Sequence, residues 1–298
     1  MKIEVKSDEN IRLDNFLIKH IDKSRSKIQS LIKKNNILVN NNSVKSSYIV
    51  KLNDVIDICD NSDQILDIKP EKMDLSIVYE DDSVIVLNKD NGVVVHPAPS
   101  KNSGTLVNGL MYYSNSLSKV NGEFRPGIVH RIDAFTTGLL MVAKNDFSHE
   151  FLAKQLEEKT THRKYIALVW GVIKNDTGTI DAPIGRDIND RKKMAVTINN
   201  SKNAVTHFKV LERYKEATLI ELKLETGRTH QIRVHMNYIG YPIVNDPVYG
   251  RRKIIDDTGQ CLHAKELGFV HPISKEFMLF DSELPDCFVN ILNKFKEE

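Results

Sequence analysis

The sequence has few cysteines and no long apolar run. Only three cysteines occur among 298 residues, Cys59, Cys261 and Cys287, and none belongs to a CxxC pair. This spacing predicts neither a disulfide framework nor a zinc site, so we expect three reduced thiols. No stretch approaches the roughly eighteen apolar residues of a membrane helix. The first residues are charged and lack the apolar core of a signal peptide, which favours a cytoplasmic protein without a membrane partner.

The charge of the chain is nearly balanced but unevenly distributed. The formal net charge is only +2, which by itself predicts no nucleic-acid partner. Between Lys19 and Lys51, however, eight basic residues accompany one acid, Asp22, and give this segment a local charge of +7. Such asymmetry is typical of a surface that binds a polyanion, although a solvated charged face would have the same composition.

Residues 1–60 are predicted to form a small domain of two helices and a sheet. Apolar residues recur at helical spacing over residues 12–21, which predicts the first helix. Ser24 can cap the second helix, because its hydroxyl accepts hydrogen bonds from free first-turn amides. Strands are expected at residues 37–39 and 55–58, and a turn at residues 40–42 follows the first strand.

One face of the second predicted helix is cationic. Its candidate RNA-binding side chains are Arg25, Lys27, Lys33 and Lys34. The domain resembles the alpha-L type RNA-binding domain, first recognised in a small-subunit ribosomal protein. The motifs that carry the resemblance are Arg12-Leu13-Asp14, Ser24-Arg25-Ser26 and Ile37-Leu38-Val39-Asn40. The resemblance implies that this domain docks on structured RNA.

Residues 61–74 are polar and contain Pro70, so we expect a linker into a larger domain, residues 75–298. Three β-branched runs within residues 76–96 indicate an antiparallel meander. Strands and helices follow without regular βαβ alternation, which predicts an α+β fold. The last predicted helix is expected to begin at the capping residue Thr229. Helical periodicity occurs at residues 104–113, 147–158 and 229–239.

One loop places an acid and an arginine between two apolar runs. Asp133 follows Arg131 by two positions, and apolar residues on either side can anchor the loop while its tip stays open to substrate. A single loop aspartate is more often a turn residue than a catalytic one. The pattern alone therefore does not predict an active site.

The same segment, PGIVHRIDAFTTGLLMVAKN, resembles the signature of the pseudouridine synthases that modify ribosomal and transfer RNA, the group usually called Rlu. The resemblance continues in the family's order over about 200 residues, far more than a single short motif provides. The further segments are Arg163–Gly171, Pro183–Arg186, Asp190–Met194, Thr226–His235, Gly240–Gly250 and Leu262–Ala264. The resemblance implies a catalytic domain built on a mixed, mostly antiparallel sheet with flanking helices and a central cleft.

The resemblance also implies the reaction. The uracil–ribose bond breaks, the base turns, and it reattaches through carbon five. Because this isomerisation involves no redox change and no net hydrolysis, we expect no cofactor and no metal. Asp133 matches the family's catalytic aspartate, which either attacks the anomeric carbon or takes a proton from the neighbouring ribose carbon. The sequence leaves both routes open.

Three further residues take roles from the resemblance. Tyr165 matches an active-site tyrosine that can stack on uracil, although packing in the core is the commoner fate of a strand tyrosine. Arg233 matches the arginine that pairs with the catalytic aspartate, and Arg228 is the competing candidate. Arg131 corresponds to the arginine that enters the space left by the flipped nucleotide. Arg186 and Arg228 are further candidate RNA contacts; the basic run that begins at Arg186 could also be a solvated loop.

Two further details concern a phosphate contact and a metal site. Ala134 stands where many relatives have a lysine, which removes a possible phosphate contact beside the catalytic loop. His230 and His235 are five residues apart, whereas helical metal ligands are three or four apart, so we expect no metal site.

Other functions remain open at this level. A non-catalytic RNA-binding or ribosome-assembly factor would also need the cationic segment, but it would not need Asp133, Tyr165 and Arg233 together. A carboxylate-dependent hydrolase would need a second acid at a suitable spacing, and none stands out. Family members with the N-terminal domain mostly act on large-subunit ribosomal RNA, so we favour that substrate over transfer RNA, with a monomer as the default.

Overall fold

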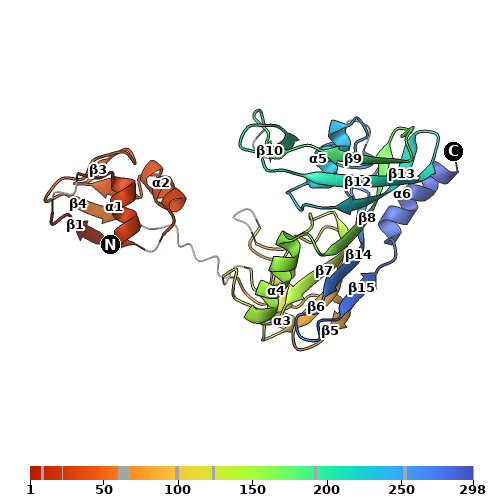
Figure 1. Ribbon diagram of the computed structural model, residues 1–298, viewed down its shortest axis with the longest axis horizontal. Coiled ribbons are helices and arrows are strands. Elements are labelled where there is room, and N and C mark those ends of the chain that lie inside the picture. The colour runs from red at the N-terminus through yellow and green to blue at the C-terminus, as the bar shows by residue number, and fades with distance from the viewer. Residues whose placement is uncertain are drawn as a thin grey trace. The chain divides into compact units, whose positions relative to one another are not determined.

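The computed structural model describes residues 1–7, 10–21, 23–59, 68–97, 101–122, 125–190, 193–250 and 254–297, without the side chain of Lys27. The chain divides into two compact units, Met1–Asp67 and Ile68–Glu298 (Figure 1). Residues 61–67 of the predicted linker lie outside the described residues. Residues 68–74 belong to the second unit, where the amide of Glu71 donates to the carbonyl of Asn108 at 3.0 Å.

The first unit consists of two helices and a four-stranded antiparallel sheet of order β1-β4-β2-β3 (Figure 1). Apolar side chains from both helices and from the sheet form one buried core, as the helical spacing predicted. The elements are β1 (Lys2–Glu4), α1 (Leu13–His20), α2 (Arg25–Lys33), β2 (Ile37–Val39), β3 (Asn42–Ser43) and β4 (Val55–Ile58).

A buried carboxylate joins the two helices of this unit. The side chain of Asp14 is fully buried, and Arg12 donates to its Oδ1 at 3.0 Å and to its Oδ2 at 3.1 Å. Arg25 and Gln29 of α2 also donate to Oδ2, at 3.1 and 2.7 Å. The hydrogen bond from Arg12 is the largest influence on Asp14, and it holds the pKa of that carboxyl well below its usual range. Arg25, a candidate RNA contact, is therefore already paired within the domain, although half of its side chain is exposed.

The second unit is built on a mixed sheet of order β5-β6-β7-β14-β8-β13-β12-β9, with β15 also paired to β14. Among the described strands, only β7 and β14 run parallel, so the predicted mixed, mostly antiparallel sheet is confirmed. The strands are β5 (Ser76–Glu80), β6 (Val84–Lys89), β7 (Thr137–Ala143), β8 (His162–Trp170), β9 (Thr177–Asp181), β12 (Val205–Arg213), β13 (Ala217–Leu224), β14 (Leu262–Val270) and β15 (Phe277–Asp281). A separate hairpin is formed by β10 (Ile184–Arg186) and β11 (Met194–Val196).

Four helices among the described residues accompany this sheet (Figure 1). Three of them occur where periodicity predicted helices, and the sequence analysis did not predict the fourth, α6. Among the described residues, no helix has the length and apolar character needed to cross a membrane. The helices are α3 (Leu106–Tyr113), α4 (Asp146–Glu157), α5 (Gln231–Tyr238) and α6 (Asp286–Lys296).

Two local predictions were wrong. The third β-branched run forms no strand, because the carbonyls of Val94 and Val95 accept hydrogen bonds from the first amides of α3. β6 therefore pairs with the distant β7 instead of completing a three-stranded meander. Helix α5 begins at Gln231 and not at Thr229, because His230 has a left-handed backbone with φ 57° that no α-helix continues through.

Candidate active site

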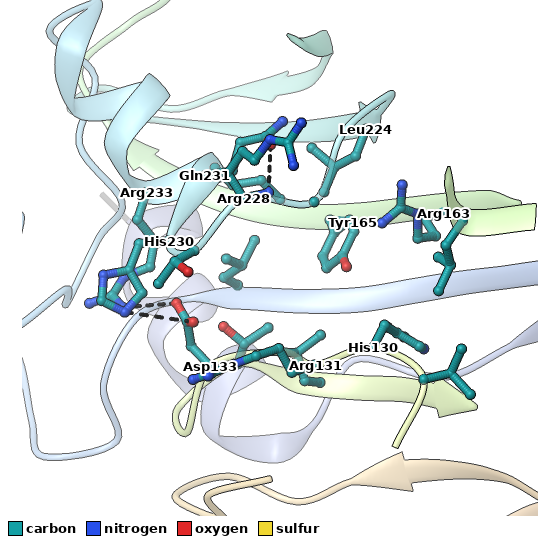
Figure 2. Close-up of a pocket in the computed structure, with 18 of the residues that line it drawn as sticks. His130, Arg131, Asp133, Arg163, Tyr165, Leu224, Arg228, His230, Gln231 and Arg233 are labelled. Carbon is teal, nitrogen blue, oxygen red and sulfur yellow. Dashed lines mark hydrogen bonds and ion pairs between the residues drawn. The ribbon is translucent and has the colours of Figure 1, made fainter. Parts of the chain in front are cut away.

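A cavity of about 440 Å³ in the second unit is lined by five segments of the chain (Figure 2). They are the loop before β7, the end of α4, the strand β8, the start of β14, and the turn after β13 with the first residues of α5. Its volume falls in the range of about 300–1,000 Å³ that is usual for ligand sites. The lining side chains of interest are Arg131, Asp133, Arg163, Tyr165, Arg228 and Arg233.

Asp133 and Arg233 meet in this cavity. Nη1 of Arg233 donates to Oδ2 of Asp133 at 2.9 Å, although the two residues are 100 positions apart in the chain. The side chain of Asp133 remains 16% exposed, whereas that of Arg233 is only 5% exposed. The arginine therefore holds one carboxylate oxygen from the interior and leaves the carboxylate accessible from the cavity.

A second carboxylate orients Arg233. Nε and Nη2 of Arg233 donate to the two carboxylate oxygens of Asp246 at 2.7 and 2.8 Å, so the guanidinium plane is clamped in a two-point contact. Asp246 also accepts backbone amides from Val248 and Tyr249. Burial opposes both charges, but the hydrogen bonds outweigh it, raising the pKa of Arg233 and lowering the pKa of Asp246. Asp246 was not among the residues predicted for the site, although it lies in a segment that carries the family resemblance.

His230 approaches the other carboxylate oxygen of Asp133. Its Nε2 lies 3.8 Å from Oδ1 of Asp133 (Figure 2). Its Nδ1 is hydrogen-bonded to the hydroxyl of Tyr249 at 2.8 Å. Burial lowers the pKa of His230, against the opposing effect of Asp133. His235, which the sequence analysis considered with His230, is buried and bonded to Thr206 and Ala182 instead. The two histidines therefore have separate partners.

Tyr165 lies on β8 and faces the cavity (Figure 2). The residue is 7% exposed, and its hydroxyl makes no hydrogen bond to another described residue. Burial raises the pKa of Tyr165, so the phenol is neutral at ordinary pH. A neutral ring with an unused hydroxyl at the wall of a cavity can stack on a flat ligand and exchange a proton with it.

Arg131 is exposed at the edge of the same loop. Its Nη1 donates to Nε2 of His96 at 3.1 Å. Burial lowers the pKa of His96 to about 4, with the charge of Arg131 acting in the same direction. His96 is therefore a neutral acceptor that orients Arg131, a contact that its position in the sequence could not reveal.

The other candidate RNA contacts lie in different surroundings. Nε of Arg228 donates to the carbonyl of Asn203 at 3.0 Å, so Arg233, and not Arg228, is the arginine bonded to Asp133. Arg186 is exposed at the end of β10, and Lys33 and Lys34 are exposed at the end of α2. The side chain of Lys27 and the residues Arg191 and Lys192 lie outside the described residues.

Lys89 is a buried cation that the sequence analysis did not single out. Its Nζ donates to the carbonyls of Asp90 and Ala134, both at 2.8 Å, and so ties the end of β6 to the loop of Asp133. Burial lowers the pKa of Lys89 to about 7, although the nearby charge of Asp133 opposes the shift. A lysine at the end of an apolar strand was the sole sequence signal for this contact.

Comparison with known protein families agrees with this architecture. Residues 83–238 match the RNA pseudouridylate synthase family, and residues 11–56 match the S4 domain. The chain therefore belongs to the RNA pseudouridylate synthase family, whose members are isomerases that act on RNA. The resemblance seen in the sequence is confirmed for both the catalytic part and the N-terminal RNA-binding domain.

Individual relatives cover nearly the whole chain. A protein of Bacillus subtilis (strain 168), described as an uncharacterized RNA pseudouridine synthase, YlyB, is 52% identical over 96% of this chain and 94% of its own length. Ribosomal large subunit pseudouridine synthase D of Neisseria meningitidis serogroup B (strain ATCC BAA-335 / MC58) is 43% identical over 96% of this chain and 79% of its own. The solved structure of human RNA Pseudouridylate Synthase Domain Containing 1 superimposes with a TM-score of 0.59 at 25% identity, covering 76% of this chain and 96% of that one.

Proposed function

We propose that this protein converts specific uridines of large-subunit ribosomal RNA to pseudouridine, with Asp133 as the catalytic carboxylate. The observation that carries the proposal is the 2.9 Å contact of Asp133 with Arg233 in a cavity of nucleoside size. The choice of RNA rests on the S4 domain and on relatives named as ribosomal large subunit pseudouridine synthases. On this proposal the protein acts in the cytoplasm, as a monomer.

Asp133 starts the reaction in either of two ways. As a nucleophile, one oxygen forms a bond to the anomeric carbon while the bond from that carbon to uracil N1 breaks. As a base, it removes the proton from the neighbouring ribose carbon and the same N1 bond then breaks. Arg233 supports both routes, because it fixes the oxygen that it binds and leaves the other, Oδ1, for the sugar.

The remaining side chains prepare the substrate. Arg131, oriented by His96, fills the space that the target nucleotide leaves when it turns out of its stack, a movement that costs a few kcal/mol. Tyr165 stacks on the released uracil and passes on the proton that carbon five loses. No cofactor or metal takes part in this sequence of steps.

Basic side chains away from the cavity hold the rest of the RNA. Exposed lysines and arginines contribute affinity through phosphate contacts that carry little sequence information. The set comprises Arg25, Lys27, Lys33 and Lys34 in the first unit and Arg186 and Arg228 in the second.

Mapping pseudouridines in total RNA tests the proposal. Cells that lack this protein should lose one or more pseudouridines of large-subunit ribosomal RNA, and the wild-type protein should restore them. Asp133→Asn should not restore them, because the amide has no negative oxygen to attack carbon or accept a proton. Asp57→Asn, which changes a carboxylate of the first unit, is the matched control and should restore them fully.

Two results would contradict the proposal. Persistence of every pseudouridine in the absence of the protein would exclude it as their source. Normal RNA binding by the wild-type protein without any isomerisation would identify a binding factor that retains the fold of an enzyme.

A further inference from the structure

Arg163 is a buried arginine without a partner in the wall of the cavity. The residue is 9% exposed, lies on β8 and lines the same cavity as Asp133. Its side chain makes no hydrogen bond and no ion pair with any other described residue, and its enclosed Nε has no acceptor among them. Arg233, in contrast, is bonded to two carboxylates. The cavity thus contains one cation whose charge is balanced and one whose charge is not.

An enclosed donor without an acceptor is costly. Removing the Nε–H of Arg163 from water without pairing it destabilises the folded protein, and the arginine does not lose its proton. Such an arrangement persists where a ligand supplies the missing partner. The ligand of Arg163 should therefore present an oxygen that is negative or becomes negative during the reaction.

The register of the sheet shows which part of a bound nucleotide reaches Arg163. Gly138, five residues after Asp133, lies beside Ala264 of β14, and Ala264 lies opposite Tyr165. Arg163 lies opposite Leu267, farther along β14 in the direction that leads away from the loop of Asp133. The order along the cavity is therefore Asp133, Tyr165, Arg163, as Figure 2 also shows.

This order matches the parts of a flipped uridine. Asp133 must reach the ribose, and Tyr165 contacts the base. Backbone phosphates continue into the RNA strand on both sides of the nucleotide, so they stay near the mouth of the cavity. A side chain that is nine-tenths buried beyond Tyr165 therefore meets the far edge of the uracil, where its carbonyl oxygens lie.

We propose that Arg163 donates a hydrogen bond to a uracil carbonyl oxygen and stabilises the uracil anion that forms when the bond to ribose breaks. The proposal rests on the isomerase function above and holds for both roles of Asp133. In each route the electron pair of the broken bond passes to N1 and is shared with the two carbonyl oxygens. Carbon five then bonds to the anomeric carbon while the bond from that carbon to Asp133 breaks or, in the other route, while Asp133 returns its proton to the neighbouring ribose carbon. Carbon five finally loses its proton and N1 gains one. A donor placed at the developing charge assists the cleavage itself.

The backbone of Gly227 lies close to the guanidinium of Arg163. A Cβ atom on Gly227 would lie 2.9 Å from Nη1 of Arg163, so the bare backbone of this turn closes against the arginine.

The neighbouring Lys164 provides a contrast on the same strand. Its ammonium is bonded to Glu266 at 2.6 Å and to Glu221 at 3.3 Å, and it does not line the cavity.

Single-turnover kinetics on an RNA substrate test the role of Arg163. Arg163→Met keeps the apolar stem and removes the donor, so cleavage should slow about 100-fold, as for the loss of one oxyanion donor. The affinity for RNA should change by less than about threefold, because the interaction strengthens only in the transition state. Arg163→Lys should recover part of the rate, and Lys164→Met, the matched control, should match the wild type.

A better leaving group provides the decisive comparison. In RNA with 5-fluorouridine at the target position, fluorine stabilises the uracil anion without help from the protein. The defect of Arg163→Met, measured as loss of the N-linked nucleotide, should then shrink to about tenfold. An equal defect on uridine and 5-fluorouridine would overturn the proposal. Weaker RNA binding at an unchanged cleavage rate would overturn it too, and would assign Arg163 to a phosphate.

Two controls distinguish failure of the proposed role of Arg163 from failure of the proposed isomerase function. If the wild-type protein forms no pseudouridine in the RNA, the proposed function fails before Arg163 is tested. If the wild type is active and Arg163→Met cleaves as fast, this inference alone fails. Unfolding followed by the fluorescence of Trp170, the single tryptophan, verifies that the Met variant is folded, and Arg163→Lys replaces it if it is not.

Discussion

Asp14 of the first unit and Asp133 of the second are both carboxylates bonded to arginine, but they differ in how completely they are satisfied. Asp14 is fully buried and accepts hydrogen bonds from two arginines and a glutamine. Asp133 accepts one arginine hydrogen bond and keeps 16% of its side chain open to the cavity. A closed set of partners makes a structural carboxylate, and an incomplete one leaves an oxygen for a substrate.

The arginines follow the same division. Those around Asp14 are partly exposed, so water shares their charge. In the second unit, Arg233 is buried between two carboxylates and Arg163 is buried with none among the described residues. Buried charge that lacks a partner therefore destabilises the second unit but not the first, and such a cost is typical of ligand-binding sites.

Asp133→Asn should have the largest effect on activity. We expect the rate of pseudouridine formation to fall at least about 10⁴-fold, as for loss of a principal catalytic group. The free energy of unfolding should change by less than about 1 kcal/mol, because the amide oxygen can still accept from Arg233. Parallel kinetics and denaturant unfolding measure both. A large loss of stability would mean that Asp133, like Asp14, is a structural carboxylate.

Asp14→Asn should show the opposite pattern. We expect the first unit to lose about 2–3 kcal/mol, less than for a fully buried pair because both arginines are partly exposed to water. Hydrogen exchange of residues 1–59 measures this loss. Asp57→Asn, which removes a surface pair with Lys2 at 3.5 Å, is the control and should cost less than about 0.5 kcal/mol. A fall in the cleavage rate at saturating RNA for Asp14→Asn would break the comparison.

Acid should destabilise the two units in different pH ranges. Burial lowers the pKa of His96 and of His263 from 6.5 to about 4, so below pH 6.5 the unfolded chain binds protons that the folded unit does not. The stability from these two histidines is present above pH 6.5 and is lost as the pH falls towards 4, by about 1 kcal/mol each at pH 5.5. Unfolding followed by Trp170 fluorescence should show this loss.

The first unit should remain stable to a lower pH than the second. The lowered pKa of Asp14 means that its contribution is present above the unfolded value of 3.8 and is lost only as the pH falls below that value. Hydrogen exchange of residues 1–59 between pH 6.5 and 4 should therefore show little loss of stability. Equal acid sensitivity of the two units would contradict this difference between them.

The smallest effect is expected at the surface of α2. Lys33→Gln with Lys34→Gln should weaken RNA binding about 3- to 10-fold and lower the salt dependence by about two phosphate contacts, with an unchanged cleavage rate. Filter binding at several salt concentrations measures both quantities. Lys159→Gln, which removes an exposed lysine paired with Glu225 at 3.2 Å, is the control. An unchanged salt dependence would remove α2 from the RNA-binding surface.

Much of the fold could be predicted from local patterns. Apolar spacing located α1, α4 and α5 within about two residues, because a helix is set by neighbours three and four positions away. The pairing of β6 with β7 could not be predicted in this way, since the two strands are separated by the whole of α3. The third β-branched run had the composition of a strand but found its hydrogen-bond partners at the end of a helix.

The sequence by itself determined the family and nominated Asp133, Tyr165 and Arg233, because these residues lie in motifs whose order can be read directly. It could not distinguish Arg163 from Lys164, two adjacent basic residues in one strand. Only the tertiary structure decided that the lysine meets Glu266 and that the arginine faces the cavity without a partner. Successive side chains of a strand point to opposite faces, and which face is a cavity depends on segments far away in the chain.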